Sequence, residues 1–225
     1  MKRTMKRTLA CSVAVLSGLL VQAAGPLAVS AHAAPPVVDL QTYGSSYGEF
    51  SARWWQWLLS IPKATSPILD TSGTYGGQGQ VDDVWFLAGT FGGTVTRSCT
   101  VPAGKPIFFP LLNTSVFKPY GYESILDLRA GAAATIDGVT SRFCDVDGVG
   151  CDSYRVRSPS FTYKAPPRAL LPTGWASVAG NSDPVISDGC WTLLTPLSPG
   201  QHTIRFGGST NTGFSTDTTY ILTVQ

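Results

Sequence analysis

Short apolar runs separated by glycine and proline make up most of the chain after residue 80, and they predict β-strands. Several runs alternate apolar with polar residues. In residues 218–224, for example, Tyr220, Leu222 and Val224 fall on one face. On this basis we predict about eight strands. They span residues 84–90, 93–99, 106–112, 135–143, 154–163, 190–194, 200–206 and 218–224.

A helical pattern precedes the strands. In residues 49–61 apolar residues recur every three or four positions, which places Trp54 and Trp57 on the face that a core would cover. Glu49 stands at the N-terminal end, where the helix dipole favours a negative charge, and Pro62 is expected to end the helix. A second, weaker helical pattern covers residues 122–133.

Strands that follow one another with few helices between them predict a mainly β fold. We expect one antiparallel β-sandwich, immunoglobulin-like or jelly-roll-like, with the Trp-rich helix packed on it. Asp137-Gly138 favours a two-residue hairpin turn, and no repeat of fixed period occurs. A single domain is predicted for residues 49–225, preceded by an N-terminal arm at residues 34–48 that is rich in Pro, Gly and Ser.

The first 33 residues have the pattern of a secretory signal peptide. Basic residues come first, a long apolar run follows, and Ala31-His32-Ala33 supplies the small residues of a cleavage site. Because the apolar run contains Gly and Pro and ends at this site, we expect secretion into the extracellular space without stable insertion in a membrane.

The cysteine pattern agrees with export. Cys99, Cys144, Cys151 and Cys190 form an even set after the signal peptide, and such a set allows three disulfide pairings in an oxidising compartment. We favour two disulfides, Cys144 with Cys151 across a Gly-containing turn and Cys99 with Cys190 between two distant strands. Zinc binding is disfavoured because no CxxC-like spacing is present.

Near the C-terminus, Thr195 to Phe206 reads Thr-Pro-Leu-Ser-Pro-Gly-Gln-His-Thr-Ile-Arg-Phe. This segment resembles the penultimate hairpin of immunoglobulin-like extracellular modules, with residues 218–224 as the closing strand. The resemblance covers roughly thirty residues; it implies a β-sandwich and no particular ligand.

Charge excludes one class of partner. The formal net charge is +2 for the whole chain, and four of the basic residues lie in the predicted signal peptide. The others are scattered from Arg53 to Arg205 without forming a cluster that could follow a phosphate backbone. We therefore expect no binding to nucleic acid.

Candidate catalytic residues are few. His202 is the one histidine after the predicted signal peptide, and its alternation with Ile204 and Phe206 favours an inward strand position over a catalytic role. Asp82 and Asp83 are adjacent, so on a strand they would point to opposite faces. The protein is therefore predicted to be a non-enzyme, with these three residues as the candidates if it is a hydrolase.

Three carboxylates, Asp145, Asp147 and Asp152, surround two glycines in the predicted short disulfide loop. Oxygen ligands on a bending backbone suit calcium, so a calcium site is a hypothesis here, although the spacing is not that of an EF-hand. A solvated turn explains the same residues, and no other cofactor is indicated.

Aromatic residues are the most abundant binding chemistry in the chain, which has 6 Trp and 8 Tyr. Most are expected in the core, and Trp55 and Trp175 are the two predicted to be exposed. We therefore predict a secreted, non-catalytic protein that recognises a polysaccharide or a cell-surface protein through loops and exposed aromatics. The alternatives are a secreted hydrolase that acts on an extracellular polymer and a structural envelope protein that self-assembles; the sequence leaves the oligomeric state open.

Overall fold

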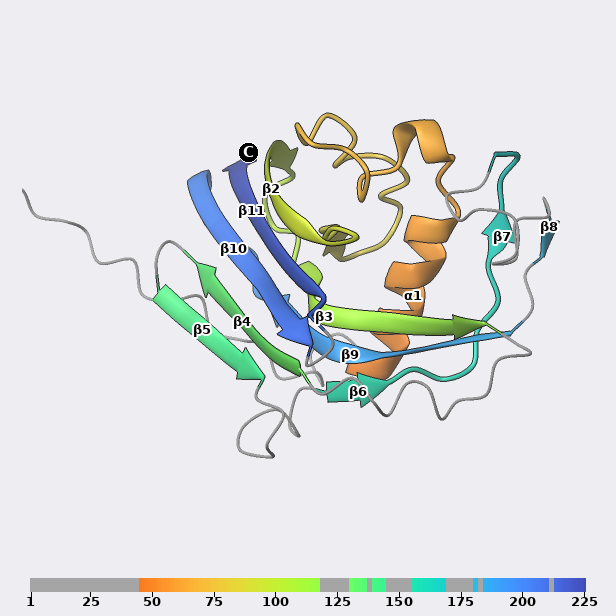
Figure 1. Ribbon diagram of the computed structural model, residues 1–225. Coiled ribbons are helices and arrows are strands. Elements are labelled where there is room, and N and C mark those ends of the chain that lie inside the picture. Colours follow the sequence, from red (N-terminus) through yellow and green to blue (C-terminus); the bar gives the residue numbers. More distant parts are fainter. Residues whose placement is uncertain are drawn as a thin grey trace, which may run out of the picture. The chain divides into compact units, whose positions relative to one another are not determined.

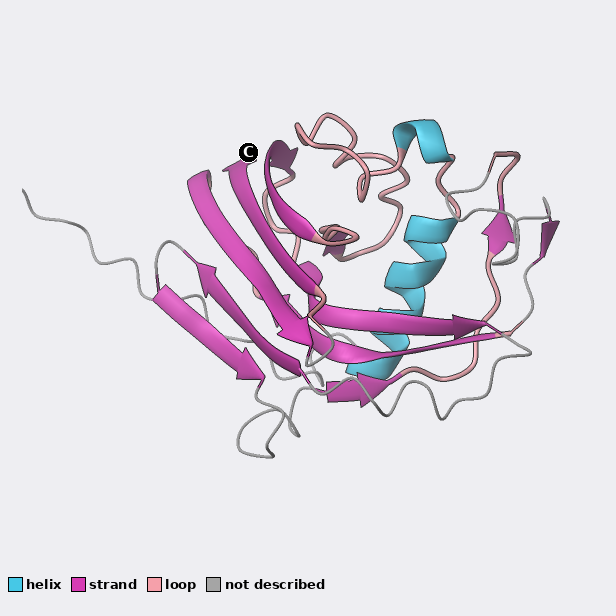
Figure 2. Cartoon of the chain, viewed as in Figure 1, coloured by secondary structure: helices cyan, strands magenta, loops and turns pink. Residues whose placement is uncertain are grey.

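The computed structural model describes residues 45–117, 130–136, 139–144, 155–168, 180–181, 184–210 and 213–225 (Figures 1 and 2). All of these residues belong to one compact unit, His32–Gln225. The predicted signal peptide and most of the predicted arm lie outside the described residues. Within the described part, no helix is both long and apolar enough to span a lipid bilayer.

Helix α1, Tyr47–Leu59, begins two residues earlier than the sequence pattern predicts. Ser46 and Glu49 form a capping box, in which the Ser46 hydroxyl accepts from the Glu49 N–H and the Glu49 carboxylate accepts from the Ser46 N–H. The C-cap is Ser60, and Pro62 follows it as predicted. The short 3₁₀ helix η2, Lys63–Thr65, comes next.

The strands of the described residues form two large sheets and a separate pair of short strands. The four-stranded sheet has the order β1 (Trp85–Phe86), β3 (Ile107–Phe117), β9 (Val185–Leu194), β6 (Arg155–Arg157). The five-stranded sheet has the order β2 (Gly93–Val101), β11 (Ser215–Val224), β10 (Gly200–Thr210), β4 (Ala130–Ile136), β5 (Val139–Cys144). Strands β7 (Lys164–Ala165) and β8 (Gly180–Asn181) pair with each other.

Both large sheets are mixed, which corrects the prediction of a purely antiparallel fold. Strand β1 pairs parallel with β3, and β2 pairs parallel with β11 over its whole length. The β2–β11 pairing joins the first strand of the five-stranded sheet to the last strand of the chain. Alternation within a strand shows which face is buried and gives no information about which distant strand lies beside it.

The four-stranded sheet is covered on both faces. On β9, Val185, Trp191 and Leu193 belong to the core that includes α1, whereas Cys190 and Leu194 belong to the core shared with the five-stranded sheet. Figure 1 shows α1 against β9 and the five-stranded sheet beside it. The result is a mainly β, sandwich-like fold with one helix packed on it, as the sequence predicts.

The core beneath α1 is largely aromatic. Phe108 of β3 stacks on Trp191 of β9 with ring centroids 5.2 Å apart, and Trp54 meets Trp191 edge-on at 5.4 Å. Trp57 packs against Phe86 at 5.5 Å. The predicted core positions Trp54 and Trp57 are therefore confirmed.

Around β4 one prediction is confirmed and another is wrong in part. Strands β4 and β5 pair with Ile136 opposite Val139, as the Asp137-Gly138 signal predicts. The predicted second helix, residues 122–133, is wrong at its C-terminal end, because residues from Ala130 onward belong to β4. Alanine is a good helix former, and the pairing of β4 with β10 overrides that local preference.

Candidate functional site

A buried arginine joins three segments of the chain beneath the surface. Arg97 of β2 is 2% exposed, and its guanidinium donates to the Tyr220 hydroxyl at 3.2 Å. It donates to four backbone carbonyls: those of Ile68 (3.1 Å), Asp70 (2.6 Å), Ala88 (2.8 Å) and Gly89 (2.7 Å). These acceptors supply the hydrogen bonds that a buried cation needs, and they fix the loop before β1 and the loop after it against β2.

Burial also raises the pKa of two groups beside this arginine. Tyr220 donates its hydroxyl proton to the Ala88 carbonyl at 2.9 Å, and burial raises its pKa to about 12 although Arg97 acts in the opposite direction. Burial likewise raises the pKa of the Cys99 thiol to about 12. At neutral pH both groups are therefore protonated, and the Cys99 thiol is a poor nucleophile.

Three exposed apolar side chains lie on the segments that meet near Arg97. Leu69 is 44% exposed and stands between two residues whose carbonyls bind Arg97, and Phe91 is 48% exposed and follows Gly89 by two positions. Phe214 is 41% exposed, and its ring reaches to 3.5 Å from where a Cβ on Gly92 would be. Phe91 and Phe214 thus flank the start of β2, and we call them the aromatic pair.

The outer face of the five-stranded sheet is polar beside the aromatic pair. By strand register, Thr94 and Thr96 of β2 stand next to Asp217 and Thr219 of β11. Arg205 of β10 forms a two-bond ion pair with Asp217, at 2.9 and 2.6 Å. The hydrogen bond from Arg205 lowers the pKa of Asp217, so this face carries hydroxyls and a fixed carboxylate at neutral pH.

The long loop between η2 and β1 is ordered by hydrogen bonds within itself. The Asp70 carboxylate accepts from the backbone N–H groups of Ser72 and Tyr75, each at 2.8 Å, and from the Ser72 hydroxyl at 2.8 Å. Burial alone would raise the pKa of Asp70, and these hydrogen bonds lower it below its ordinary value. Ordered loops of this length in compact proteins are commonly functional.

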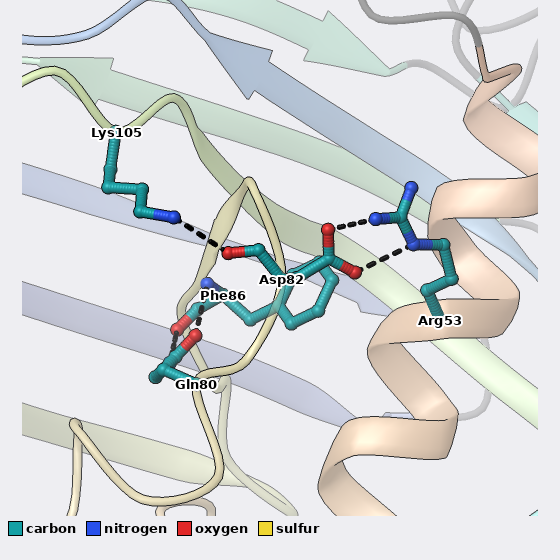
Figure 3. Close-up of polar contacts among 5 residues, drawn as sticks. All are labelled: Arg53, Gln80, Asp82, Phe86 and Lys105. Atoms are coloured by element: carbon teal, nitrogen blue, oxygen red, sulfur yellow. Dashed lines mark hydrogen bonds and ion pairs between the residues drawn. The ribbon is translucent and has the colours of Figure 1, made fainter.

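The C-terminal part of the loop is clamped to α1 and β1, as Figure 3 shows. Arg53 makes a two-bond ion pair with Asp82, and Lys105 donates to the Asp82 carbonyl at 2.9 Å. The Gln80 side chain exchanges hydrogen bonds with the backbone of Phe86, at 2.7 and 3.0 Å. Between these two clamped residues stands Val81, whose side chain is 96% exposed.

The structure separates the candidate catalytic residues by environment. Asp82 is tied to Arg53, and Asp83 is exposed beside it. His202 is 5% exposed on the inner face of β10, as predicted, and its Nε2 lies 2.8 Å from the Ser198 carbonyl oxygen. The contacts of Asp82 and His202 give these two residues a structural explanation that does not require catalysis.

The exposure predicted for Trp55 is wrong, because its side chain is only 6% exposed. Segments on both sides of α1 cover this helix: Trp57 donates to the Gln78 carbonyl at 2.8 Å, and Gln56 donates to the Thr162 carbonyl at 2.8 Å. The periodicity of a helix does not indicate whether a loop will cover its second face. Trp175, the other residue predicted to be exposed, lies outside the described residues.

The predicted disulfide between Cys99 and Cys190 is also wrong. Cys99 is a free thiol that faces the loop at Gly76, where a Cβ would lie 3.0 Å from the Cys99 Cβ. Cys190 lies on β9 in the other sheet and is itself disulfide-bonded, so its partner is a cysteine other than the free Cys99. The predicted partners Cys144 and Cys151 have no described side chains, so the pairing of Cys144 with Cys151 stays a prediction.

The calcium hypothesis rests on Asp145, Asp147 and Asp152, which lie outside the described residues. Among the side chains that are described, no group of three or more His, Cys, Asp or Glu residues could hold a metal ion.

The sequence reasoning missed the aromatic pair and the clamped loop. Phe91 precedes Gly92-Gly93 and Phe214 follows Gly213, and all three of these glycines have positive φ angles. Glycine is a turn signal, and turns lie at the surface, so these glycines could have marked the adjacent Phe91 and Phe214 as exposed. No sequence signal identifies the contact between Arg53 and Asp82.

No protein-family model matches the chain, and no curated protein matches it either. Among solved structures, the chain is similar to the cysteine protease inhibitor EhICP2 from Entamoeba histolytica, at 16% sequence identity. The match covers 59% of this chain and 94% of the inhibitor, with a TM-score of 0.23. A similarity at this level assigns neither a fold family nor a function to the chain.

Proposed function

We propose that the protein is a secreted, non-catalytic protein that binds an extracellular polysaccharide through the aromatic pair, Phe91 and Phe214. The observation that carries this proposal is that both rings are more than two-fifths exposed at the same end of the five-stranded sheet. Exposed apolar side chains that gather in one region of a surface are a feature of binding sites.

The surroundings of the aromatic pair suit a sugar chain. Aromatic rings pack against the apolar faces of sugar rings, and sugar hydroxyls require hydrogen-bonding partners around them. Thr94, Thr96 and the Arg205–Asp217 ion pair supply such partners on the adjoining sheet face. We also propose that the sandwich is immunoglobulin-like. Such folds present binding residues at the ends of their sheets, which is where Phe91 and Phe214 lie.

The proposal is tested by measuring binding of the purified protein to a panel of bacterial and plant polysaccharides, by depletion onto insoluble polymers and by calorimetry with soluble ones. Phe91→Ala/Phe214→Ala should weaken binding at least about tenfold, because truncating a binding aromatic costs more than about 1 kcal/mol. Val81→Ala is the matched control, since it shortens an exposed apolar side chain elsewhere. Equal affinities for the double variant and the wild type, or no binding to any polymer, would contradict the proposal.

A second candidate function is recognition of a cell-surface protein through Val81. Its side chain is almost fully exposed between two clamped residues, so it can enter an apolar pocket with little loss of conformational freedom on binding. Binding of labelled protein to whole cells that is lost in Val81→Asp and kept in Phe91→Ala/Phe214→Ala would favour this function over polysaccharide binding.

A further inference from the structure

Strand β2 forms one edge of the five-stranded sheet, where β11 is its only partner strand among the described residues (Figure 1). Backbone groups alternate in direction along a strand. Val101 accepts from the Gln225 N–H at 3.2 Å on the β11 side, whereas Ser98 donates to the Ser72 carbonyl at 2.8 Å on the opposite side. The backbone groups of Thr94 and Thr96 therefore point away from β11, in the same direction as those of Ser98.

The stretch from Thr94 to Thr96 is open. Both side chains are exposed, and no backbone hydrogen bond at this edge engages either residue within the described part of the chain. Among the described residues, the loop closes this edge at Ser98, where Gly73 approaches so tightly that a Cβ on it would lie 2.2 Å from the Ser98 carbonyl oxygen. Proteins usually protect open edges with charged residues or proline, and this stretch has neither.

We propose that a second copy of this chain pairs with the open stretch, β2 against β2 in antiparallel orientation about a two-fold axis at Val95. In this register Thr94 of each copy faces Thr96 of the other copy. Each of these two facing pairs exchanges two backbone hydrogen bonds, so four hydrogen bonds form in all. The inference does not depend on the proposed polysaccharide binding.

Other antiparallel registers are less complete. Moving the axis to Thr96 leaves one such pair, because Thr94 then faces Ser98, whose N–H already binds Ser72. Moving the axis to Thr94 places Thr96 opposite Gly92, which has a φ of 122° and lies in a turn.

A second copy fits this edge better than an unrelated strand for two reasons. The pairing is isologous, so each copy satisfies the same unpaired groups that it presents. The facing side chains are threonines, which form favourable cross-strand pairs and carry no charge to repel an identical partner. The only charged side chain on β2 is Arg97, which is buried.

The first test is the oligomeric state of the purified protein by sedimentation equilibrium over a range of concentrations. We expect a monomer–dimer equilibrium for the wild type and a monomer for Thr96→Pro, because proline removes the outward N–H without removing a β2–β11 hydrogen bond. Thr100→Pro is the matched control: it makes the same change on the same strand beyond the pairing stretch, and it should dimerise like the wild type.

A charge-swap experiment separates loss of pairing from loss of folding. Thr94→Lys/Thr96→Lys and Thr94→Glu/Thr96→Glu should each be monomeric, and an equimolar mixture of the two should form a heterodimer. A wild type that stays monomeric up to about 1 mM, a Thr96→Pro variant that dimerises like the wild type, or a mixture that stays monomeric would each overturn the proposal.

Discussion

At the scale of single residues, hydrogen bonds to uncharged groups hold ionised side chains in place. Arg97 is nearly fully buried, and the hydrogen bonds it donates end on backbone carbonyls and on the Tyr220 hydroxyl. The Asp70 carboxylate is held in the complementary way, by backbone N–H groups of its own loop. The two residues are linked, because Arg97 also binds the Asp70 carbonyl. Both are therefore expected to contribute to stability.

Replacing Arg97 should destabilise the protein strongly. Arg97→Met removes the arginine donor from the Ile68, Asp70 and Gly89 carbonyls, whereas the Ala88 carbonyl still accepts from the Tyr220 hydroxyl. Each unsatisfied group costs about 1–3 kcal/mol. Allowing for partial relaxation, we expect a loss of about 3–5 kcal/mol in the free energy of unfolding, measured with urea. Arg97→Lys should recover little of it, because one ammonium cannot reproduce the planar array of donors.

The matched control is Arg205→Met, which removes an arginine from the exposed ion pair with Asp217. Such pairs contribute about 0–1 kcal/mol. If the Arg97 and Arg205 variants lost similar stability, the role assigned to Arg97 would be refuted.

Asp70 should make stability depend on pH on the acid side. Its folded pKa lies below the ordinary value of 3.8, so its carboxylate stabilises the fold above that pH, and the contribution is lost as the pH falls through the folded pKa. Asp70→Asn should therefore be less stable than the wild type at neutral pH, and the difference should shrink below about pH 4. Urea unfolding across pH measures this, with the exposed Asp83→Asn as control. A difference that is constant from about pH 2 to pH 7 would contradict the prediction.

At the scale of elements, close approach of neighbouring backbones depends on residues without a large side chain. Gly189 of β9 lies opposite Asn113 of β3, and a Cβ on Gly189 would lie 2.6 Å from the Asn113 Cα. On the helix side, Ser51 of α1 and Ser187 of β9 are hydrogen-bonded at 2.9 Å. These small residues let α1 and β3 both pack closely on β9.

Gly189→Ala should lower the free energy of unfolding by about 1–3 kcal/mol, because backbone atoms surround the added methyl group and only a shift of the strands can make room. Thermal or urea unfolding measures the change. Gly77→Ala is the control, since its Cβ would meet only Trp85, at an ordinary 3.9 Å. A Gly189→Ala variant as stable as Gly77→Ala would show that the strands have room at this position.

At the scale of the whole molecule, β9 connects the two cores. Its residues face α1 on one side and the five-stranded sheet on the other, so both faces of β9 are buried. Strand β2 pairs parallel with β11 and forms one edge of the five-stranded sheet. The same pairing places Phe91 and Phe214 at the same end of the sheet, because Phe91 precedes β2 and Phe214 precedes β11 in parallel strands.

How much could be predicted from the sequence depends on whether a signal is local. The spacing of Trp54 and Trp57, the stop at Pro62 and the inward position of His202 are all confirmed, because each follows from the geometry of one element. Trp55 was mispredicted because its burial depends on segments that cover the helix from elsewhere in the chain.

The sequence by itself determined that this is a mainly β protein with one Trp-rich helix, where several strands begin, and which face of β10 and β11 is buried. Propensity, capping and side-chain alternation act over a few residues, so they can be read along the chain. The tertiary structure alone decided the parallel pairing of β2 with β11, the free thiol of Cys99, the ion pair between Arg53 and Asp82, and the exposure of Phe91 and Phe214. Each of these depends on contacts between distant segments, which local patterns do not specify.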